Sequence, residues 1–130
     1  MIFFGHKFIK NESFYHIFDI DSILHTPPSS TVYLEFKEEN LDIISHANLN
    51  NINLALKIST ITELMYASAL DAKYIVLSKE MAKNAQNIAE NYLFDAKILV
   101  SIENDSEIEE LATLGVDGVI YPNAIIKINS

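Results

Sequence analysis

The sequence contains no cysteine among its 130 residues. This absence excludes disulfides, thiolate zinc sites, iron–sulfur clusters and cysteine nucleophiles. Glycine is also scarce, and the three present, Gly5, Gly115 and Gly118, form neither a G-x-G-x-x-G motif nor a Walker A loop. We therefore expect no cofactor, and the sequence offers no catalytic set.

Arginine is absent as well. All nine basic residues are lysine, against eighteen acidic residues, and the net charge is −9. Arginine is the usual bidentate clamp for phosphate and carboxylate. The charge balance excludes nucleic acid and anionic membranes as partners, and it disfavours small phosphorylated ligands. The abundance of Ile, Asn and Lys indicates A/T-rich codons, a simpler explanation of the missing arginine than any functional one.

Long hydrophobic runs are missing too, and no run is long enough to span a membrane. The start, MIFFGHKFIK, has only four apolar residues before Gly5 and no preceding positive charge. Such a start is too short for the hydrophobic region of a signal peptide. These features predict a cytoplasmic location.

Short apolar runs are present, and amphipathic segments separate them. The runs are mostly continuous, which is typical of strands covered on both faces of a parallel sheet. They lie at residues 31–36, 53–59, 73–78, 96–102 and 117–122. The segments between them, at residues 38–47, 61–71, 79–93 and 105–114, are predicted helices. We expect five residues of the central strands to be buried: Val76, Ile98, Val100, Val119 and Ile120.

This order predicts one α/β domain over residues 1–130, with repeated βα units over residues 31–123 and a mostly parallel five-stranded sheet. Two packings remain open. The first choice is a doubly wound, flavodoxin-like sheet in three layers, and the second is a half-barrel that dimerises. The tail AIIKINS, residues 124–130, alternates and could be a short strand or a frayed end.

The N-terminal section, residues 1–30, is rich in aromatic residues. The KNES stretch, residues 10–13, predicts the turn of a hairpin, and residues 19–26 predict a short helix that Pro27 and Pro28 end. The aromatic rings of this hairpin would either cap the sheet or contact a partner, in which case the interface residues are Phe3, Phe4, Phe8, Phe14, Tyr15 and Phe18. The histidines His6, His16 and His25 match no metal-ligand spacing, so we predict no metal site and interpret them as surface residues.

Polar residues follow the predicted strands. Ligands bind beyond the carboxyl ends of strands in open parallel sheets. The candidate ligand-binding residues at those ends are Glu35, Ser78, Lys79, Glu103 and Asn123. Serine, asparagine and acidic residues at such places also serve as helix N-caps, and capping is the simpler interpretation. The lysines offer no Schiff-base candidate at a strand end, because Lys57 sits within NLALKIS and Lys73 and Lys97 begin strands.

The stretch SEIEELATLGVDGVIYP, residues 106–122, resembles the last βαβ unit of response-regulator receiver domains. That resemblance implies a flavodoxin-like fold, but Ser78 stands in place of the phosphoacceptor aspartate and Tyr121 in place of the conserved lysine. A receiver of this kind could not accept an aspartyl phosphate. The same stretch also resembles the last βα units of phosphate-binding TIM barrels, although complete barrels need about twice this length.

The sequence favours a non-enzymatic, acidic, receiver-like module that acts through protein contact or as a homo-oligomer. The alternative is a small-molecule-binding or phosphate-binding protein, or an enzyme, with its site at the carboxyl ends of the strands.

Overall fold

The computed structural model describes residues 1–128. Its strands form a single eight-stranded sheet in the order β1-β7-β6-β5-β4-β3-β2-β8. Every pairing between neighbouring strands is parallel. The strands are β1 (Ile2–Phe4), β2 (Phe14–His16), β3 (Thr31–Glu35), β4 (Asn53–Lys57), β5 (Tyr74–Leu77), β6 (Lys97–Ser101), β7 (Gly118–Ile120) and β8 (Ile125–Lys127).

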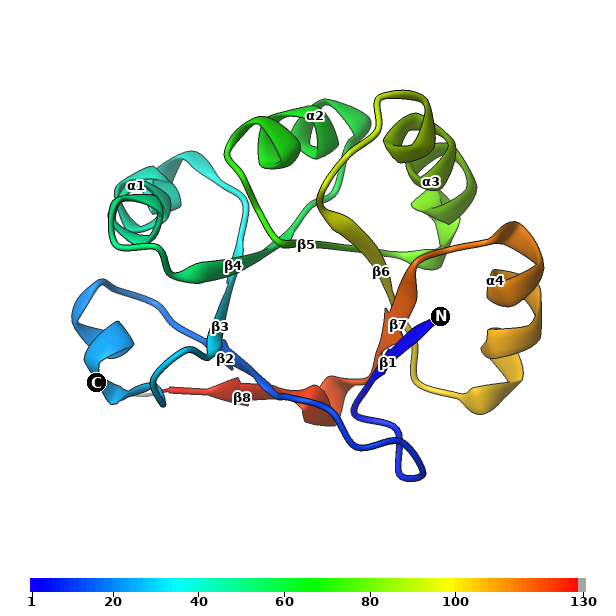
Figure 1. Ribbon diagram of the computed structural model, residues 1–130, viewed down its shortest axis with the longest axis horizontal. Coiled ribbons are helices and arrows are strands. Elements are labelled where there is room, and N and C mark those ends of the chain that lie inside the picture. Colours follow the sequence, from blue (N-terminus) through cyan, green and yellow to red (C-terminus); the bar gives the residue numbers. More distant parts are fainter. Residues whose placement is uncertain (129–130) are drawn as a thin grey trace.

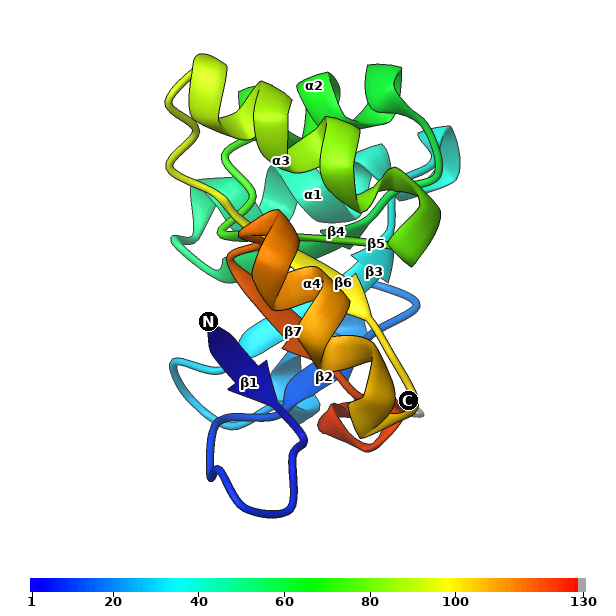
Figure 2. The same cartoon turned by 90° about the vertical axis from the view of Figure 1, so that its right-hand side faces the viewer.

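The sheet curls around a central axis, with the four α-helices outside it (Figures 1 and 2). The helices are α1 (Leu41–Leu49), α2 (Ile61–Ala69), α3 (Ala82–Asn91) and α4 (Ile108–Leu114). Short 3₁₀ turns precede three of them or fill other connections: η1 (Asp21–His25), η2 (Glu38–Asn40), η3 (Lys79–Met81), η4 (Asp105–Glu107) and η5 (Pro122–Ala124). None of the helices described within residues 1–128 has the length and apolar character needed to cross a membrane.

The predicted α/β class and parallel sheet are confirmed, and the five predicted strands are β3 to β7. The predicted count of five was wrong, because the sheet also takes in β1, β2 and β8. The doubly wound, flavodoxin-like packing was wrong as well, because strands that follow one another in sequence are neighbours from β2 to β7 and the helices cover one face. The half-barrel alternative describes this curled sheet better.

The predicted N-terminal hairpin does not form. A hairpin needs antiparallel neighbours, whereas β1 pairs in parallel with β7, and β2 lies in parallel between β3 and β8. The KNES stretch belongs to the loop that joins these separated strands. The predicted short helix is η1, and the alternating tail forms β8 at Ile125–Lys127, while residues 129–130 of that tail lie outside the described part.

Two apolar layers line the two faces of the sheet. The outer layer joins Ile98 and Val100 of β6 to buried helix residues such as Ala85 and Leu111. The inner layer contains Leu99 of the same strand and no residue of α1 to α4. Side chains alternate between the faces of a strand, so the continuous apolar runs fill both layers at once. The predicted burial is confirmed, since Val76, Ile98, Val100, Val119 and Ile120 are all at most 1% exposed.

Aromatic rings fill the inside of the curled sheet. Phe4 and Phe14 lie 4.8 Å apart between ring centroids, and Tyr74 lies 5.3 Å from Phe4 and 5.1 Å from Phe14. Phe4 and Phe14 are 1% and 0% exposed. β1 and β2 thus supply two of the rings that fill the interior.

The end of β1 is tied to the segment between β7 and β8. The backbone N–H of Tyr121 donates to the carbonyl of Phe4 at 2.9 Å, and the Asn123 amide donates to the carbonyl of Gly5 at 3.0 Å. Gly5 has a φ of +87°, and a Cβ there would lie 3.1 Å from the Cβ of Ala124. These contacts link β1 to η5, the turn that leads to β8, although no ladder of backbone bonds joins β1 to β8 within residues 1–128.

Candidate functional site

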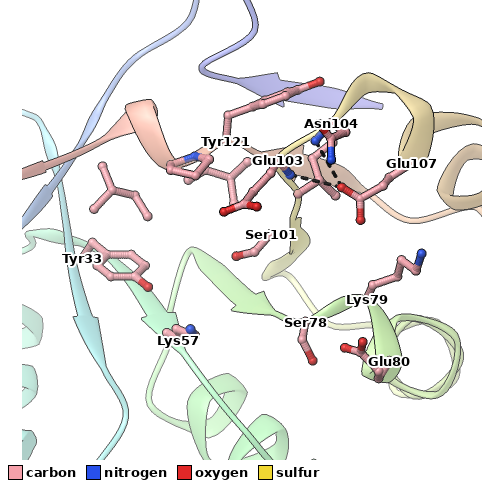
Figure 3. Close-up of a pocket in the computed structure, with 14 residues that line it drawn as sticks. Tyr33, Lys57, Ser78, Lys79, Glu80, Ser101, Glu103, Asn104, Glu107 and Tyr121 are labelled. Carbon is pink, nitrogen blue, oxygen red and sulfur yellow. Dashed lines mark hydrogen bonds between the residues drawn. The ribbon is translucent and has the colours of Figure 1, made fainter.

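The carboxyl ends of the strands open on a cavity of about 510 Å³, which we call the mouth cavity (Figure 3). Strands β3 to β8 and the turns that follow them supply its walls. Its lining residues are Tyr33, Lys57, Ser78, Lys79, Glu80, Ser101, Ile102, Glu103, Asn104, Glu107, Ile120, Tyr121, Pro122 and Ile125. The volume falls within the range of about 300–1,000 Å³ that small-molecule sites occupy.

Lys57 is the last residue of β4 and lines this cavity. Its neighbours Leu54 and Leu56 belong to the outer, helix-facing layer, so Lys57 faces inward. Its ammonium makes no hydrogen bond or ion pair with the residues that the structure describes. The sequence interpretation, which placed Lys57 within a strand and away from its end, was wrong. The alternation N-L-A-L-K was the sequence signal for this position. Its two leucines face the helices, so the lysine faces the inside of the sheet, where a charged side chain is accommodated only at the open end.

Tyr33 of β3 brings a hydroxyl to the same cavity. Its side chain is only 6% exposed, and its ring packs edge-on against His16, with 5.0 Å between ring centroids. Its hydroxyl has no hydrogen-bond partner among residues 1–128, and in Figure 3 it is directed into the cavity. Burial, and then the charge of Glu35, raise the pKa of Tyr33 to about 12. The phenol is therefore a neutral donor at physiological pH.

Three predicted ligand-binding residues, Ser78, Lys79 and Glu103, line the mouth cavity together. Lys79 lies at the rim, where its ammonium is 3.7 Å from the Glu110 carboxylate and both side chains are well exposed. Such an exposed ion pair contributes little stability. Glu103 makes no side-chain hydrogen bond or ion pair with the described residues, and its carboxylate is turned toward the cavity in Figure 3. Lys57 and Glu103 thus offer charges of opposite sign.

Carboxylates lie at the starts of the two helical segments that begin at the cavity. Glu107 accepts hydrogen bonds from the backbone N–H groups of Glu103 and Asn104, at 3.1 and 3.2 Å. These bonds lower the pKa of Glu107. At η3, the backbone N–H of Glu80 and the hydroxyl of Ser78 lower the pKa of the Glu80 carboxyl. Glu107, which was not among the predicted site residues, therefore caps the start of η4, whereas Ser78, the N-cap residue of η3, makes no side-chain cap hydrogen bond.

A hydrogen-bonded group forms the outer wall beside β1. The Tyr121 hydroxyl donates to the Asp105 carboxylate, and His6 Nε2 lies 3.4 Å from the same carboxylate. Burial, and then this bond, raise the pKa of Tyr121 to about 12, while the Tyr121 hydroxyl and His6 lower the pKa of Asp105. His6 Nδ1 accepts the backbone N–H of Phe8 at 3.1 Å. His6 is 8% exposed in its side chain, so its interpretation as a surface histidine was wrong.

The two other predicted ligand-binding residues lie outside the mouth cavity. Glu35 lines a smaller cavity of about 230 Å³ at the ends of β2 and β3, together with His16 and Lys37. Burial lowers the pKa of His16, and the charge of Glu35 partly opposes this effect. Asn123 is occupied with the carbonyl of Gly5, so its amide ties β1 to η5. In the described residues, no three His, Asp or Glu side chains are grouped as metal ligands.

The predicted interface aromatics occupy different environments. Phe4 and Phe14 lie inside the curled sheet and reach no surface. Phe3 and Tyr15 are partly buried. Phe8 and Phe18 are 78% and 55% exposed, and these two remain available to a partner. Phe8 lies on the loop after β1, where it packs against His6 and under the Lys7 ammonium.

The fold and the cavity define a small α/β protein with a curled parallel sheet and a polar site at the carboxyl ends of its strands. No protein-family model matches the chain, and no curated protein matches it significantly.

Proposed function

We propose that this protein binds a small polar molecule in the mouth cavity. The observation that carries the proposal is the Tyr33 hydroxyl, which belongs to a side chain that is 6% exposed and has no partner within residues 1–128. The hydroxyl is not enclosed in the protein, since no buried side-chain donor or acceptor among the described residues lacks a partner; it opens on the cavity, where a ligand can accept its hydrogen bond. The hydroxyl faces a cavity that also contains the uncompensated ammonium of Lys57.

The position of the cavity supports the same proposal. In barrels of parallel strands, ligand sites lie at the carboxyl ends of the strands, while the opposite end serves stability. The inner aromatic rings close the interior below the cavity, so a ligand would rest on the apolar side chains of Ile120 and Ile125. Polar groups around an apolar floor are typical of small-molecule sites.

A thermal-shift screen tests the proposal. A panel of organic acids, amino acids, sugars, sugar phosphates and nucleotides is added to the protein, and the melting temperature is measured. A ligand at 100 times its dissociation constant adds about 2.7 kcal/mol to the free energy of unfolding, which raises the melting temperature by several degrees. Amide chemical shifts then locate the site, and we expect changes at Ser78 and Ser101.

Lys73, at the amino end of the sheet, is the control position for that mapping. A panel without any stabilising compound, or a compound whose shifts cluster around Lys73, would contradict a mouth-cavity site. Tyr33→Phe provides the matched variant, because it removes only the hydroxyl. We expect it to reduce the thermal shift while leaving the unliganded protein folded.

We propose self-association as a second candidate function. It is supported by the exposed loop after β1, where Phe8 and Ile9 are 78% and 41% exposed. Light scattering over a range of concentrations measures the mass. We expect a dimer that Phe8→Ser converts to a folded monomer, while Leu24→Ser, at a distant exposed position, leaves the mass unchanged. A wild-type protein that is monomeric at the highest concentration would contradict this candidate.

A further inference from the structure

We infer that the ligand of the mouth cavity is a small organic carboxylate that also carries hydroxyl or amino groups, rather than a phosphate ester. The inference rests on the proposed binding function and names the chemical class of its ligand. It depends on which hydrogen-bond donors around the cavity are free and which are already occupied.

Carboxylates of the protein occupy backbone donors at both helix starts beside the cavity. Phosphate groups bind at helix N-termini, where free N–H groups point toward the ligand. At the start of η4, the N–H groups of Glu103 and Asn104 both donate to the Glu107 carboxylate. At the start of η3, the Glu80 carboxylate is stabilised by its own N–H and by the Ser78 hydroxyl. Each of these helix starts already carries an anion of the protein.

The charges of the lining also disfavour a phosphate. A phosphate monoester carries about −1.5 to −2 charges at neutral pH. Glu80, Glu103 and Glu107 all line the cavity, and of its two lysines Lys79 lies beside Glu110. A doubly charged group would therefore face three carboxylates with one uncompensated cation. A single carboxylate needs only that one cation.

The free donors match one carboxylate group. Tyr33 and Lys57 lie on the neighbouring strands β3 and β4, and both face inward. Tyr33 is in register with Ala55, which places Lys57 two residues further along toward the open end. The phenol and the ammonium have no other partners among the described residues, so they can donate to the two oxygens of one ligand carboxylate. Ser101, on β6, adds a further hydroxyl to this lining.

Glu103 defines the second requirement. Its carboxylate faces the cavity without a partner in the part of the chain that the structure describes (Figure 3). An ionised carboxylate accepts hydrogen bonds and cannot donate them. A ligand that filled the cavity with a purely apolar tail would desolvate Glu103 without compensation. Hydroxyl or ammonium groups on the ligand provide that compensation.

Four probes of six carbons separate these requirements. Gluconate has a carboxylate and hydroxyls, hexanoate has only the carboxylate, glucitol has only hydroxyls, and glucose 6-phosphate replaces the carboxylate with a phosphate. Isothermal titration or NMR titration measures each affinity. We expect gluconate to bind at least about tenfold more tightly than the other three, because each lacks one of the matched groups or brings excess charge.

Variants locate the contacts. Tyr33→Phe and Lys57→Met should each weaken gluconate binding by about tenfold or more. Lys97→Met, at the first residue of β6 and the opposite end of the sheet, is the matched lysine control and should leave the affinity unchanged. Glu103→Gln should reduce the difference in affinity between gluconate and hexanoate, because hexanoate would no longer have to desolvate a charged carboxylate. Circular dichroism of each variant establishes that it is folded.

The outcomes separate the inference from the proposed function. Tighter binding of glucose 6-phosphate, mapped to Ser78 and Ser101, would overturn the inference and leave the binding function standing. Gluconate binding that is insensitive to both Tyr33→Phe and Lys57→Met would also overturn it. If none of the four probes binds, the hits of the wider thermal-shift screen decide: hydroxy or amino acids support the inference, phosphates or neutral compounds overturn it, and an absence of hits overturns the binding function as well.

Discussion

The aromatic residues Phe4, Phe14 and Tyr74 explain how so short a chain fills the inside of a curled sheet. An eight-stranded barrel has an interior just wide enough for side chains to fill. Here three rings lie within about 5 Å of one another at the centre. Two of them come from strands of only three residues, which shows that these short strands belong to the core.

Replacement of Phe14 by alanine tests this role. Phe14 is 0% exposed, so Phe14→Ala should lower the free energy of unfolding by about 3–5 kcal/mol through lost burial and a cavity. Urea denaturation followed by circular dichroism measures the change. Phe8→Ala is the matched control, because Phe8 is 78% exposed and its loss should change stability by no more than about 0.5 kcal/mol. Equal effects of the two substitutions would show that Phe14 does not fill the interior.

The βα connections at the mouth show how helix starts are specified. Thr60 and Glu63 cap α2, where the Thr60 hydroxyl accepts the N–H of Glu63 and the Glu63 carboxylate accepts the N–H of Ser59. Glu107 has the equivalent position before α4. Capping boxes of this kind stabilise a helix start by satisfying its free N–H groups. They also leave those groups unavailable to ligands, so the same local feature shapes both the element and the site.

The cap at Glu107 predicts part of the pH dependence of stability. Hydrogen bonds from the N–H groups of Glu103 and Asn104 lower the pKa of Glu107 below its ordinary value of 4.5. A carboxyl whose pKa is lowered by folding stabilises the protein above its unfolded pKa, and this stability is lost as the pH falls through the lowered pKa. Glu107→Gln keeps an oxygen acceptor but cannot titrate. We therefore expect its melting temperature to fall less than that of the wild type between pH 5 and about pH 3.

Glu109→Gln is the control for this experiment. Glu109 lies one turn into the same helical segment, and its carboxylate makes no hydrogen bond or ion pair with the described residues. It should retain the acid dependence of the wild type. A Glu107→Gln profile that runs parallel to both would contradict the proposed contribution of the cap.

At the scale of the whole molecule, the central strands of the sheet have more paired neighbours than the edge strands. β3 to β6 are strands of four or five residues that pair with neighbours on both sides, whereas β1 and β8 are three-residue strands at the edges. Each edge strand is held by a partner that is distant in sequence: β1 pairs with β7, and β8 pairs with β2. Local stability is expected to follow this difference in pairing.

Hydrogen exchange tests this gradient of stability. We expect the amides of Ile75 to Leu77 and of Ile98 to Val100 to exchange slowest, through global unfolding. The amides of β1 and β8 should exchange through local opening of lower free energy, because each edge strand has one paired neighbour. NMR-detected exchange at several denaturant concentrations measures both classes. Equal protection of the Phe3 and Val76 amides would contradict the gradient, because it would show that the edge strands open with the same free energy as the centre.

The sequence by itself determined the elements that depend on neighbouring residues. Continuous apolar runs predicted β3 to β7, amphipathic spacing predicted the four helices, and burial of Val76, Ile98 and Val100 followed from the same runs. The helix predicted at residues 105–114 ends at Gly115, whose left-handed conformation, with φ of +79°, suits a glycine at a helix end. Each of these features is decided within one element, so the sequence is sufficient to predict it.

Only the tertiary structure decided which strands the short strands pair with and which polar side chains line the same cavity. β1 and β2 are too short for a clear periodic signal, and β7 and β8, with which they pair, lie far away along the chain, so a local turn signal wrongly favoured a hairpin. The rule of strand ends indicated Ser78, Lys79 and Glu103, which line the mouth cavity. Tyr33 and Lys57 were not, because a side chain points into the mouth cavity only when the curl of the sheet has made one of its faces an interior. Phe4, Phe14 and Tyr74 come from three separate strands, and only the folded sheet brings their side chains together in that interior.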